Sequence, residues 1–432
     1  ARQHGAAAAD VVILDQTALS ASCRLGKPED IDRAESVDIS LRVLIGRRQA
    51  FVSSSDIKAP ALDAMAERAV AMARAAPEDA YAALAPEDRL WRGDKADQLD
   101  LYDETNLSSE QLVAMARAAE DAALAVPGVS NSEGAGAGWS RRYFGLVTSH
   151  GFCAGRVGSN FSISASVLAG VGTTMERDYE FSSARHVGDL EAAADIGRRA
   201  GERAVRRLNP RKIPTGAMPV VFDPRVANSL LGHFAGAING QAVARGSSFL
   251  RDKMNQPIFA PGIAIIDDPL RRRGLASRLF DGEGVCCERR DIISDGILTS
   301  WLLDTATAAQ LGLATTGHAG RSGAGAPAPT SSNLYLAPGT RTADALIGDI
   351  GEGFYVTELI GMGVNPVTGD YSRGASGFLI DDGVLTHSVS EVTIAGNLND
   401  MFMALTPADD LTFRYGVNAP TLRVDGMTVA GS

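Results

Sequence analysis

Two Asp-Gly pairs between alternating apolar and polar runs constrain the fold of this chain more than any other feature. Asp295-Gly296 lies inside "VCCERRDIISDGILTSWLLD", and Asp382-Gly383 lies inside "GFLIDDGVLTHSVSEVTI". A tight hairpin turn needs positive φ at both central positions, which aspartate and glycine adopt more readily than most residues. Each stretch therefore predicts strand, turn and strand, and the second half of the chain is expected to be rich in antiparallel sheet.

Strand-like and helical segments alternate irregularly along the first half. Residues 10–54 and 130–188 alternate apolar with polar residues, which predicts half-buried strands. Between them, one predicted helix carries apolar residues at helical spacing: Leu62, Met65, Ala69 and Met72. The next helix begins with a possible capping box formed by Ser108 and Gln111. A third helix is predicted over residues 189–210.

These patterns predict an α+β protein of two domains, with antiparallel sheets, β-hairpins and packed helices, rather than a doubly wound parallel sheet. Residues 211–217 contain proline and glycine between two predicted elements, which indicates a boundary. We expect an N-terminal α+β domain over residues 1–213 and a sheet-rich C-terminal domain over residues 214–432. Residues 318–333 are rich in Gly, Pro and Ser and predict an exposed loop.

Composition and charge exclude several classes of protein. The net charge of −11 argues against nucleic acid as a direct partner, because phosphate binding requires clustered basic residues. The basic triplet Arg271–Arg273 is interpreted as a solvated turn. No run of about 18 apolar residues exists, so no membrane-spanning helix is expected. The four cysteines form no C-x-x-C pair and no signal-peptide pattern is visible, so we expect reduced thiols and a cytoplasmic location.

Familiar catalytic motifs are absent or incomplete. Ser55 to Lys58 match S-x-x-K, but the companion motifs of that chemistry are missing, so these residues are interpreted as the start of a helix. His150 and Cys153 lack a second ligand pair nearby. No nucleophile–base pair can be identified, so no catalytic residue is predicted and an autonomous hydrolase is the least favoured function.

The stretch "DPRVANSLLGHFAGAINGQAVARGSSFL" predicts a helix with Asp223 as its N-cap and proline in the first turn. Its apolar stripe consists of Val226, Leu230, Phe234 and Ala237. His233 lies three residues after Leu230 and shares this face. Spacing alone favours a packed histidine with one hydrogen bond over a metal ligand, and both interpretations stay open.

Several long stretches resemble the TldD/PmbA family. They are the helix stretch quoted above, "GEGVCCERRDIISDGILTSWLLDTATAAQLGLATTGHAG", "VTELIGMGVNPVTGDYSRGASGFLIDDG" and "VSEVTIAGNLNDMF". Shorter likenesses in the first half are "NSEG", "SHG" and "MERDYEFSSAR". Within the family the chain is similar to the PmbA, or TldE, branch, often labelled a modulator of DNA gyrase. The likeness covers most of the chain in the same order.

The resemblance implies a relation to zinc peptidases. TldD members of the family act on flexible peptides as heterodimers with a TldE-type subunit, and their helix carries His-Glu, three residues and a second His, with a cysteine near the C-terminus. Here the first His becomes Asn228, the Glu becomes Ser229, and His233 matches the second His. The C-terminal segment holds no cysteine. Since catalytic zinc needs about three protein ligands and a carboxylate base, no cofactor is expected in this subunit, and the zinc is expected in a TldD-type partner.

Two further segments supply candidates for contact with a peptide or a partner. The glycine-rich segment from Gly361 to Gly377 is either a loop between two hairpins or the lining of a cavity between subunits, and its candidates are Asp370, Tyr371 and Arg373. The segment before the first Asp-Gly turn offers Glu283, Glu288, Arg289 and Arg290.

The predicted function is that of the non-metal-binding subunit of a TldD/TldE-like metallopeptidase complex that cleaves flexible peptides. The partner would be a TldD-type subunit, forming a heterodimer, or a second copy of this chain, forming a homodimer. An extended peptide commonly binds by adding a strand to a sheet edge, which a chain so rich in sheet can offer. The alternative is a homodimeric peptide- or protein-binding regulator without peptidase activity.

Overall fold

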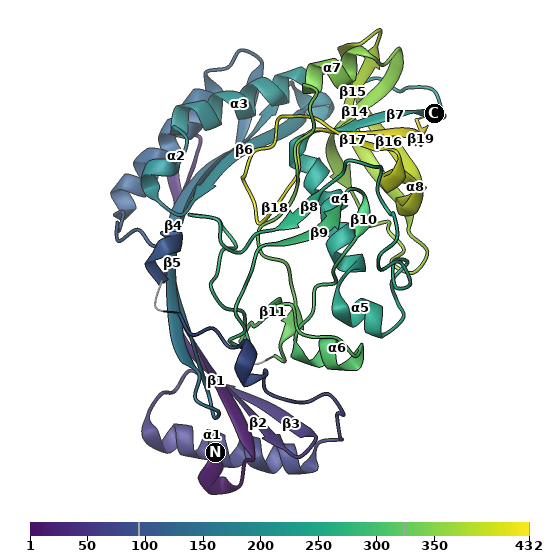
Figure 1. The fold of residues 1–432 in the computed structure, drawn as a ribbon. Coiled ribbons are helices and arrows are strands. Elements are labelled where there is room, and N and C mark those ends of the chain that lie inside the picture. The colour runs from purple at the N-terminus through teal and green to yellow at the C-terminus, as the bar shows by residue number, and fades with distance from the viewer. Residues whose placement is uncertain (94–95, 324, 432) are drawn as a thin grey trace.

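A computed structural model describes residues 1–93, 96–323 and 325–431 as an α+β protein (Figure 1). The predicted fold class is confirmed, with mainly antiparallel pairing and a C-terminal half rich in sheet. None of the helices in these ranges is long and apolar enough to cross a lipid bilayer.

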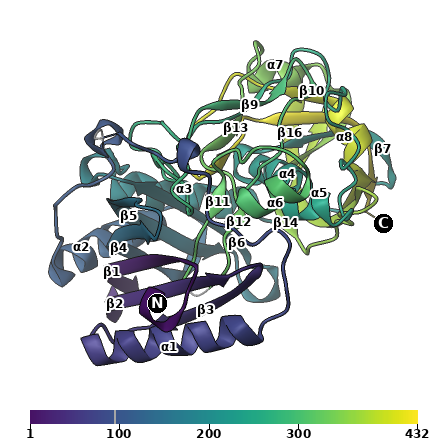
Figure 2. The same cartoon turned by 60° about the horizontal axis from the view of Figure 1, so that its bottom comes forward.

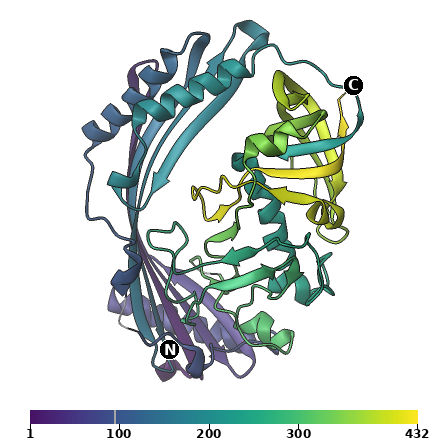
Figure 3. The same cartoon turned by 45° about the horizontal axis from the view of Figure 1, so that its top comes forward.

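Six strands of the first half form one antiparallel sheet in the order β3-β2-β1-β4-β5-β6. They are β1 (Ala8–Arg24), β2 (Lys27–Ile45), β3 (Arg48–Ser54), β4 (Val129–Thr148), β5 (Cys153–Ala169) and β6 (Glu176–Ala184). Figure 3 shows these long strands running the length of the molecule, with the C-terminal half on the other side. The sheet therefore forms one wall of the protein.

Three helices cover one face of this sheet: α1 (Ala59–Ala75), α2 (Ser109–Leu124) and α3 (Ala193–Arg206). Figure 2 shows α1 running along β1–β3. Ala9 of β1 packs in the cluster of α1, and Ala21 packs in the cluster of α2 and α3. Val12 instead packs with Phe144 and Phe280 of the opposite face. Since side chains alternate along a strand, odd-numbered residues of β1 face the helices and even-numbered residues face the C-terminal half.

The predicted start of α2 is confirmed, whereas the predicted buried face of α1 is wrong at one residue. The capping box is confirmed: the Gln111 amide N–H donates to Ser108 Oγ, and the Ser108 N–H donates to Gln111 Oε1 at 2.8 Å. In α1, however, Met72 is 47% exposed, whereas Ala73 is buried. Small alanines let this helix lie close to the sheet, so the stripe that packs is rotated away from the one that the larger apolar residues suggested.

Five strands of the C-terminal half pair in the order β16-β15-β14-β7-β19, and a further pairing of β16 with β19 closes them into a ring. They are β7 (Gly216–Phe222), β14 (Glu352–Ile360), β15 (Asp370–Asp381), β16 (Val384–Asn397) and β19 (Leu422–Ala430), with β17 (Leu405–Pro407) added at β19. A second sheet has the order β10-β9-β8-β13-β18.

The strands of this second sheet are β8 (Ile265–Asp267), β9 (Arg290–Ser294), β10 (Ile297–Leu298), β13 (Leu334–Leu336) and β18 (Val417–Asn418). A two-stranded sheet joins β11 (Ala319–Gly320) to β12 (Ala328–Pro329). The helices are α4 (Pro224–Ala237), α5 (Gly240–Ala244), α6 (Thr305–Gln310), α7 (Ala343–Gly348) and α8 (Leu398–Met403). The ring, the second sheet and α4 share one apolar core.

Both Asp-Gly hairpins are confirmed. Asp295 and Gly296 have φ of 49° and 78° and connect β9 to β10, while Asp382 and Gly383 have φ of 50° and 77° and connect β15 to β16. The first hairpin is shorter than its alternating sequence suggested, because β9 begins only at Arg290. The preceding residues instead pack at the junction with the first sheet.

Two predicted loops are more structured than expected. In residues 318–333, His318 and Ser332 are each only 2% exposed and both bond to the buried carboxylate of Asp267, so the ends of this segment are not an exposed loop. The amino-acid composition of residues 318–333 could not indicate this burial, because it depends on Asp267, which lies far away in the sequence. Within the glycine-rich segment, Gly377 lies inside β15, where a Cβ atom would overlap the carbonyl oxygen of Tyr355.

Arg271–Arg273 do not form a free, solvated turn. Arg272 Nη2 and Arg273 Nε each lie 2.7 Å from Asp100 Oδ2, and Arg273 Nη1 lies 2.9 Å from Asp189 Oδ2. These carboxylates belong to the first half of the chain, so the triplet ties the two halves together. The interpretation as a solvated turn was wrong because Asp100 and Asp189 lie far away in the sequence, where no local pattern indicates that they pair with these arginines.

Glu120 of α2 fastens the turn between β1 and β2. Its fully buried carboxylate accepts the N–H groups of Leu25 and Gly26, both at 2.8 Å, and the hydroxyl of Ser132. Burial raises the pKa of this carboxyl, but the hydrogen bonds from Ser132, Gly26 and Leu25 outweigh burial and lower it. The charged form is therefore the one that the fold stabilises.

We expect Glu120→Gln to lower the free energy of unfolding by about 2–4 kcal/mol at neutral pH, because an amide leaves part of this buried donor set without an acceptor. Since the folded pKa is lowered, the contribution of Glu120 is present above the ordinary glutamate pKa and is lost as pH falls through the folded value. Urea unfolding at several pH values checks this. Asp121→Asn, at the exposed next position, is the control. A difference from wild type that does not shrink in acid would contradict the assignment.

Candidate functional site

The helix that carries the family resemblance is α4, which packs against strands of both C-terminal sheets. Asp223 is the N-cap, as predicted, and its Oδ1 accepts the Arg225 N–H at 2.9 Å. The Tyr355 hydroxyl donates to Asp223 Oδ2 at 2.9 Å. Leu230 and Phe234 are buried in the core. The helix is thus held firmly at its start and along its apolar face.

Asn228, Ser229 and His233 are the residues that the sequence resemblance aligns with the family's metal motif. Ser229 Oγ donates to the Val226 carbonyl oxygen at 2.6 Å, so the hydroxyl is used within the helix. The three side chains offer an amide, a hydroxyl and one imidazole, whereas zinc selects thiolate, imidazole and carboxylate ligands. This donor set does not fit a zinc ion. Within the described residues, no group of three or more His, Cys, Asp or Glu side chains is arranged to hold a metal.

His233 packs against Tyr371 of β15. Their ring centroids lie 6.0 Å apart in an edge-to-face arrangement with an interplanar angle of 77°. His233 Nε2 and the Tyr371 hydroxyl oxygen are both buried and have no hydrogen-bond partner among the described residues. Burial lowers the pKa of His233, and the charge of Arg373 lowers it further. His233 is therefore a packed, neutral ring, and it lacks the single hydrogen bond that the packing interpretation supposed.

Asp370 and Arg373 lie on β15 next to an exposed apolar loop. Asp370 Oδ2 accepts the Thr368 hydroxyl at 2.6 Å, and this bond, followed by one from Asn397, lowers the pKa of Asp370. Residues 360–367, which we call the apolar loop, expose the side chains of Ile360 (60%), Met362 (83%) and Val367 (54%). The structure thus brings His233, Tyr371 and Arg373 together and sets Asp370 beside the loop.

The candidates before β9 separate into one buried and three accessible residues. Glu283 is buried at the junction of the two halves: its Oε1 lies 3.8 Å from Arg42 Nη1, and its Oε2 accepts the Thr305 N–H at 2.8 Å. Burial, followed by the charge of Asp281, raises the pKa of Glu283 to about 8. The other three residues retain side-chain exposure and pair within their own segment: Glu288, Arg289 and Arg290. All four lie in the segment that leads into β9 of the second sheet, and none lies on a strand of the ring formed by β7, β14, β15, β16 and β19.

Sequence reasoning missed a group of arginines on the sheet face that meets the C-terminal half. Arg142 of β4, Arg156 of β5, and Arg278 and Arg321 of the C-terminal half line one cleft. No spacing pattern could identify them, because they come from four separate segments. The register of β4 and β5 brings Arg142 and Arg156 near each other, and the covering segments of the C-terminal half bring Arg278 and Arg321 to the same cleft.

We expect His233→Phe to reduce the loss of stability on acidification. Because the folded pKa of His233 is lowered, the unfolded chain binds more protons below the ordinary histidine pKa of about 6.5, so stability falls with pH there. The effect is modest, because solvent screens the charge at the partly exposed ring. Unfolding measured from neutral to mildly acidic pH tests this. Tyr371→Phe removes an unpaired hydroxyl without an ionisation in this range and should leave the pH profile unchanged. A full acid-dependent loss in His233→Phe would refute the assignment.

Three comparisons with known proteins agree with this architecture. The metalloprotease PmbA of Escherichia coli O157:H7 is 36% identical over 428 residues, which cover 98% of this chain and 92% of that protein. A crystal structure of a proposed modulator of DNA gyrase from Bacteroides thetaiotaomicron is 28% identical, with a TM-score of 0.91, and covers 100% of this chain and 96% of its own. TldE from Thermococcus kodakarensis, at 20% identity and a TM-score of 0.89 over 100% of this chain and 98% of its own, shares the fold.

Family models divide the chain into three consecutive parts. Domain 1 of the PmbA/TldA metallopeptidases matches residues 9–73, the central domain matches residues 102–208, and the C-terminal domain matches residues 215–431. The first two parts contribute strands to the same six-stranded sheet, whereas the third contains α4 and both C-terminal sheets. With most of its length matched in order, this chain belongs to the PmbA/TldA metallopeptidase family.

Proposed function

We propose that this chain is the non-metal-binding, TldE-type subunit of a metallopeptidase complex that cleaves flexible peptides with a TldD-type partner. One feature supports the proposal: α4 has an N-cap and a buried apolar face, while the family resemblance aligns Asn228 and Ser229 with a zinc ligand and the catalytic base. The helix thus has the capping and packing of a stable structural element, but it lacks the side chains that would bind zinc and accept a proton. Such a pattern is expected when the helix is needed for shape rather than for catalysis.

The site around α4 lacks both parts of a zinc-peptidase mechanism. A catalytic zinc needs about three protein ligands and one open position for water. A carboxylate must also accept the proton of that water. Ser229 supplies no carboxylate, and His233 is the single imidazole of the set. We therefore expect the chain to be metal-free and inactive alone, with the partner supplying the zinc.

The apolar loop is the proposed contact with the partner subunit. Met362 is 83% exposed, and large apolar side chains gathered on a surface are typical of interaction sites. Asp370 and Arg373 would supply polar contacts at the edge of this patch. Exposed Glu288 and Arg289, with half-buried Arg290, are proposed as secondary contacts with peptide or partner.

A cytoplasmic location is part of the proposal. All four cysteines are free thiols, and two of them, Cys153 and Cys286, are exposed. Exposed thiols persist in a reducing compartment and oxidise readily outside it. We therefore place the complex in the cytoplasm.

We expect the chain alone to leave an unstructured peptide intact, whereas a mixture with a TldD-type subunit forms a stable complex and cleaves it. Light scattering after size-exclusion chromatography measures the complex, and mass spectrometry measures the cleavage. A chain that forms only homodimers and binds peptides without cleavage in the mixture would instead support a regulator and reject the subunit role.

We expect Met362→Asp to weaken the complex by about ten-fold or more, because a charge would replace apolar area buried at the contact. Val171→Asp is the matched control, since Val171 is 75% exposed in the first half of the chain. Titration calorimetry of each variant with the partner gives the affinity. Equal affinities for both variants would place the contact elsewhere.

A further inference from the structure

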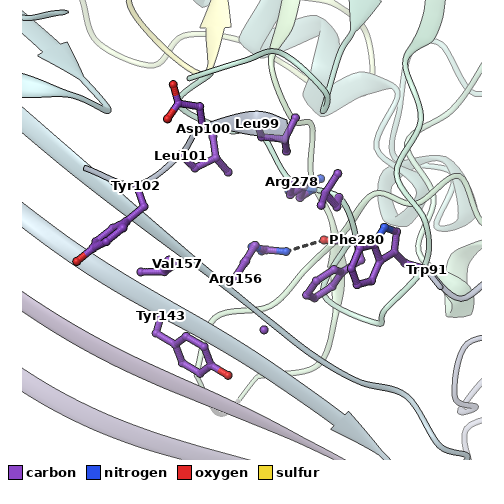
Figure 4. A pocket seen from close by; sticks show the side chains of 12 residues that line it. Trp91, Leu99, Asp100, Leu101, Tyr102, Tyr143, Arg156, Val157, Arg278 and Phe280 are labelled. Carbon is purple, nitrogen blue, oxygen red and sulfur yellow. Dashed lines mark hydrogen bonds between the residues drawn. The ribbon is translucent and has the colours of Figure 1, made fainter. Parts of the chain in front are cut away.

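A cleft separates the first sheet from segments of the C-terminal half. Its floor is formed by side chains of four adjacent strands, β2, β1, β4 and β5, and its roof by residues 275–278 and 321–323. This cavity measures about 570 Å³. A second cavity of about 520 Å³ adjoins it at the edge of β5, and the two share the lining residues Leu101, Arg156, Val157 and Arg278 (Figure 4).

Three arginines in this cleft have no carboxylate partner. Arg142 donates from Nε and Nη2 to Gln16 Oε1 at 3.1 and 2.7 Å, Arg156 Nη1 donates to the Phe280 carbonyl oxygen at 2.6 Å, and Arg278 Nη2 donates to the Thr330 carbonyl oxygen at 3.2 Å. Among the described residues, no acid forms an ion pair with these three guanidinium groups. In a chain of net charge −11, the cleft thus gathers three guanidinium groups that lack a directly paired carboxylate.

Two arginines of the cleft also retain buried N–H groups that are unpaired among the described residues. Arg321, whose side chain is fully buried, bonds to Asp10 Oδ1 at 2.6 Å but leaves Nε and Nη1 without a partner. Arg278 likewise leaves Nε unpaired. Arg185 differs, because backbone carbonyl groups of Ser159, Gly274 and Leu275 occupy its donors. Unpaired buried donors are costly, so an acceptor entering the cleft would gain from meeting them.

The acids near the cleft do not cancel this charge. Asp38 of β2, an exposed residue, lines the first cavity, and Asp100, which lines the second, is paired with Arg272 and Arg273. Asp281 is buried below, where its carboxylate already accepts N–H groups of Glu283, Val285 and Ala319. Burial, followed by the charge of Arg278, lowers the pKa of Arg156 to about 10, so Arg156 is still charged at neutral pH. The cleft therefore favours an anionic group.

The second cavity adds an apolar wall. Trp91, Tyr102, Tyr143 and Phe280 line it together with aliphatic side chains (Figure 4). The Tyr143 ring lies over two paired glycines, Gly145 and Gly155, and a Cβ atom on Gly155 would overlap the Tyr143 hydroxyl. These glycines thus allow the ring to lie flat on the sheet and open the wall to a ligand.

An unpaired strand edge borders the same cavity. β6 pairs with β5 only over Phe161–Ala169, so the edge of β5 from Cys153 to Gly158 has no neighbouring strand in the described part of the chain. Gly155 and Val157 of this edge line the cavity. Main-chain N–H and C=O groups at a sheet edge recognise an extended peptide, whereas a nucleic acid offers no matching backbone pattern.

We propose that this cleft binds an extended peptide segment that carries a carboxylate, with the carboxylate between Arg142, Arg156 and Arg278 and the peptide backbone along the β5 edge. Guanidinium groups bind carboxylates through paired, charge-assisted hydrogen bonds. Apolar side chains of the peptide would lie against Trp91 and Phe280. The carboxylate belongs either to an aspartate or glutamate side chain or to the peptide's own C-terminus. The proposal rests on the proposed function in taking peptides as the ligand class.

The test uses the whole chain alone and a labelled, unstructured peptide that contains aspartate and phenylalanine, with binding followed by fluorescence anisotropy. Three further peptides carry an amidated C-terminus, asparagine in place of aspartate, or both changes. We expect the doubly neutral peptide to bind about ten-fold more weakly, and binding of the charged peptides to weaken with salt. Loss on amidation alone assigns the C-terminal carboxylate, and loss on the asparagine change alone assigns the side chain.

Arg142→Gln is the decisive variant, since Arg142 is exposed and its loss should not disturb folding. We expect it to weaken binding of the acidic peptide by about ten-fold, the size of one charge-assisted hydrogen bond. Arg141→Gln, next on the same strand and on the opposite face, should bind as wild type does. Equal binding of charged and neutral peptides, no effect of Arg142→Gln, or tighter binding of a single-stranded oligonucleotide would overturn the proposal.

The two proposals fail separately. Peptide binding by the isolated chain without cleavage in any mixture would reject the subunit role and keep the cleft. Cleavage in the mixture with an unchanged rate and affinity for Arg142→Gln would keep the subunit role and reject the cleft.

Discussion

Buried arginine–carboxylate pairs between the first sheet and the C-terminal half hold the two halves of this protein in one arrangement. Arg321 reaches Asp10 of β1 at 2.6 Å with both side chains buried, and Arg225 at the start of α4 reaches Asp178 of β6 at 2.8 Å. Removing one partner of such a pair costs about 3–5 kcal/mol, because the other charge is left buried. The ion pairs therefore fix the relative orientation of the two halves more strictly than apolar contact alone would. The position of α4 relative to the first sheet and the width of the cleft both depend on that orientation.

Elements set by neighbouring residues could be predicted from sequence, and contacts between distant segments could not. The Asp-Gly hairpins, the Ser108 capping box and the Asp223 N-cap each depend on residues a few positions apart. The burial of His318 depends on Asp267, and the pairing of Arg273 depends on Asp100. No periodic pattern in the sequence indicates which residues make contacts over such long separations in the chain.

The candidate site divides in the same way. The resemblance to the family pointed to α4 and to three motif positions, of which Asn228 and Ser229 differ from the family's residues, but the contact of His233 with Tyr371 required the fold of β15 against α4. The cleft arginines gave no signal, since alternation along β4 and β5 predicts only which residues share a face. It does not predict that the C-terminal half covers that face.

The zinc content of the purified chain tests the central claim most directly. The chain would be equilibrated with zinc, freed of excess metal by gel filtration and measured by mass spectrometry alongside His233→Ala. We expect far less than one zinc per chain in both, because one imidazole with an amide and a hydroxyl cannot hold the ion. About one zinc per chain, lost in His233→Ala, would show a working metal site on α4 and contradict the subunit role proposed for this chain.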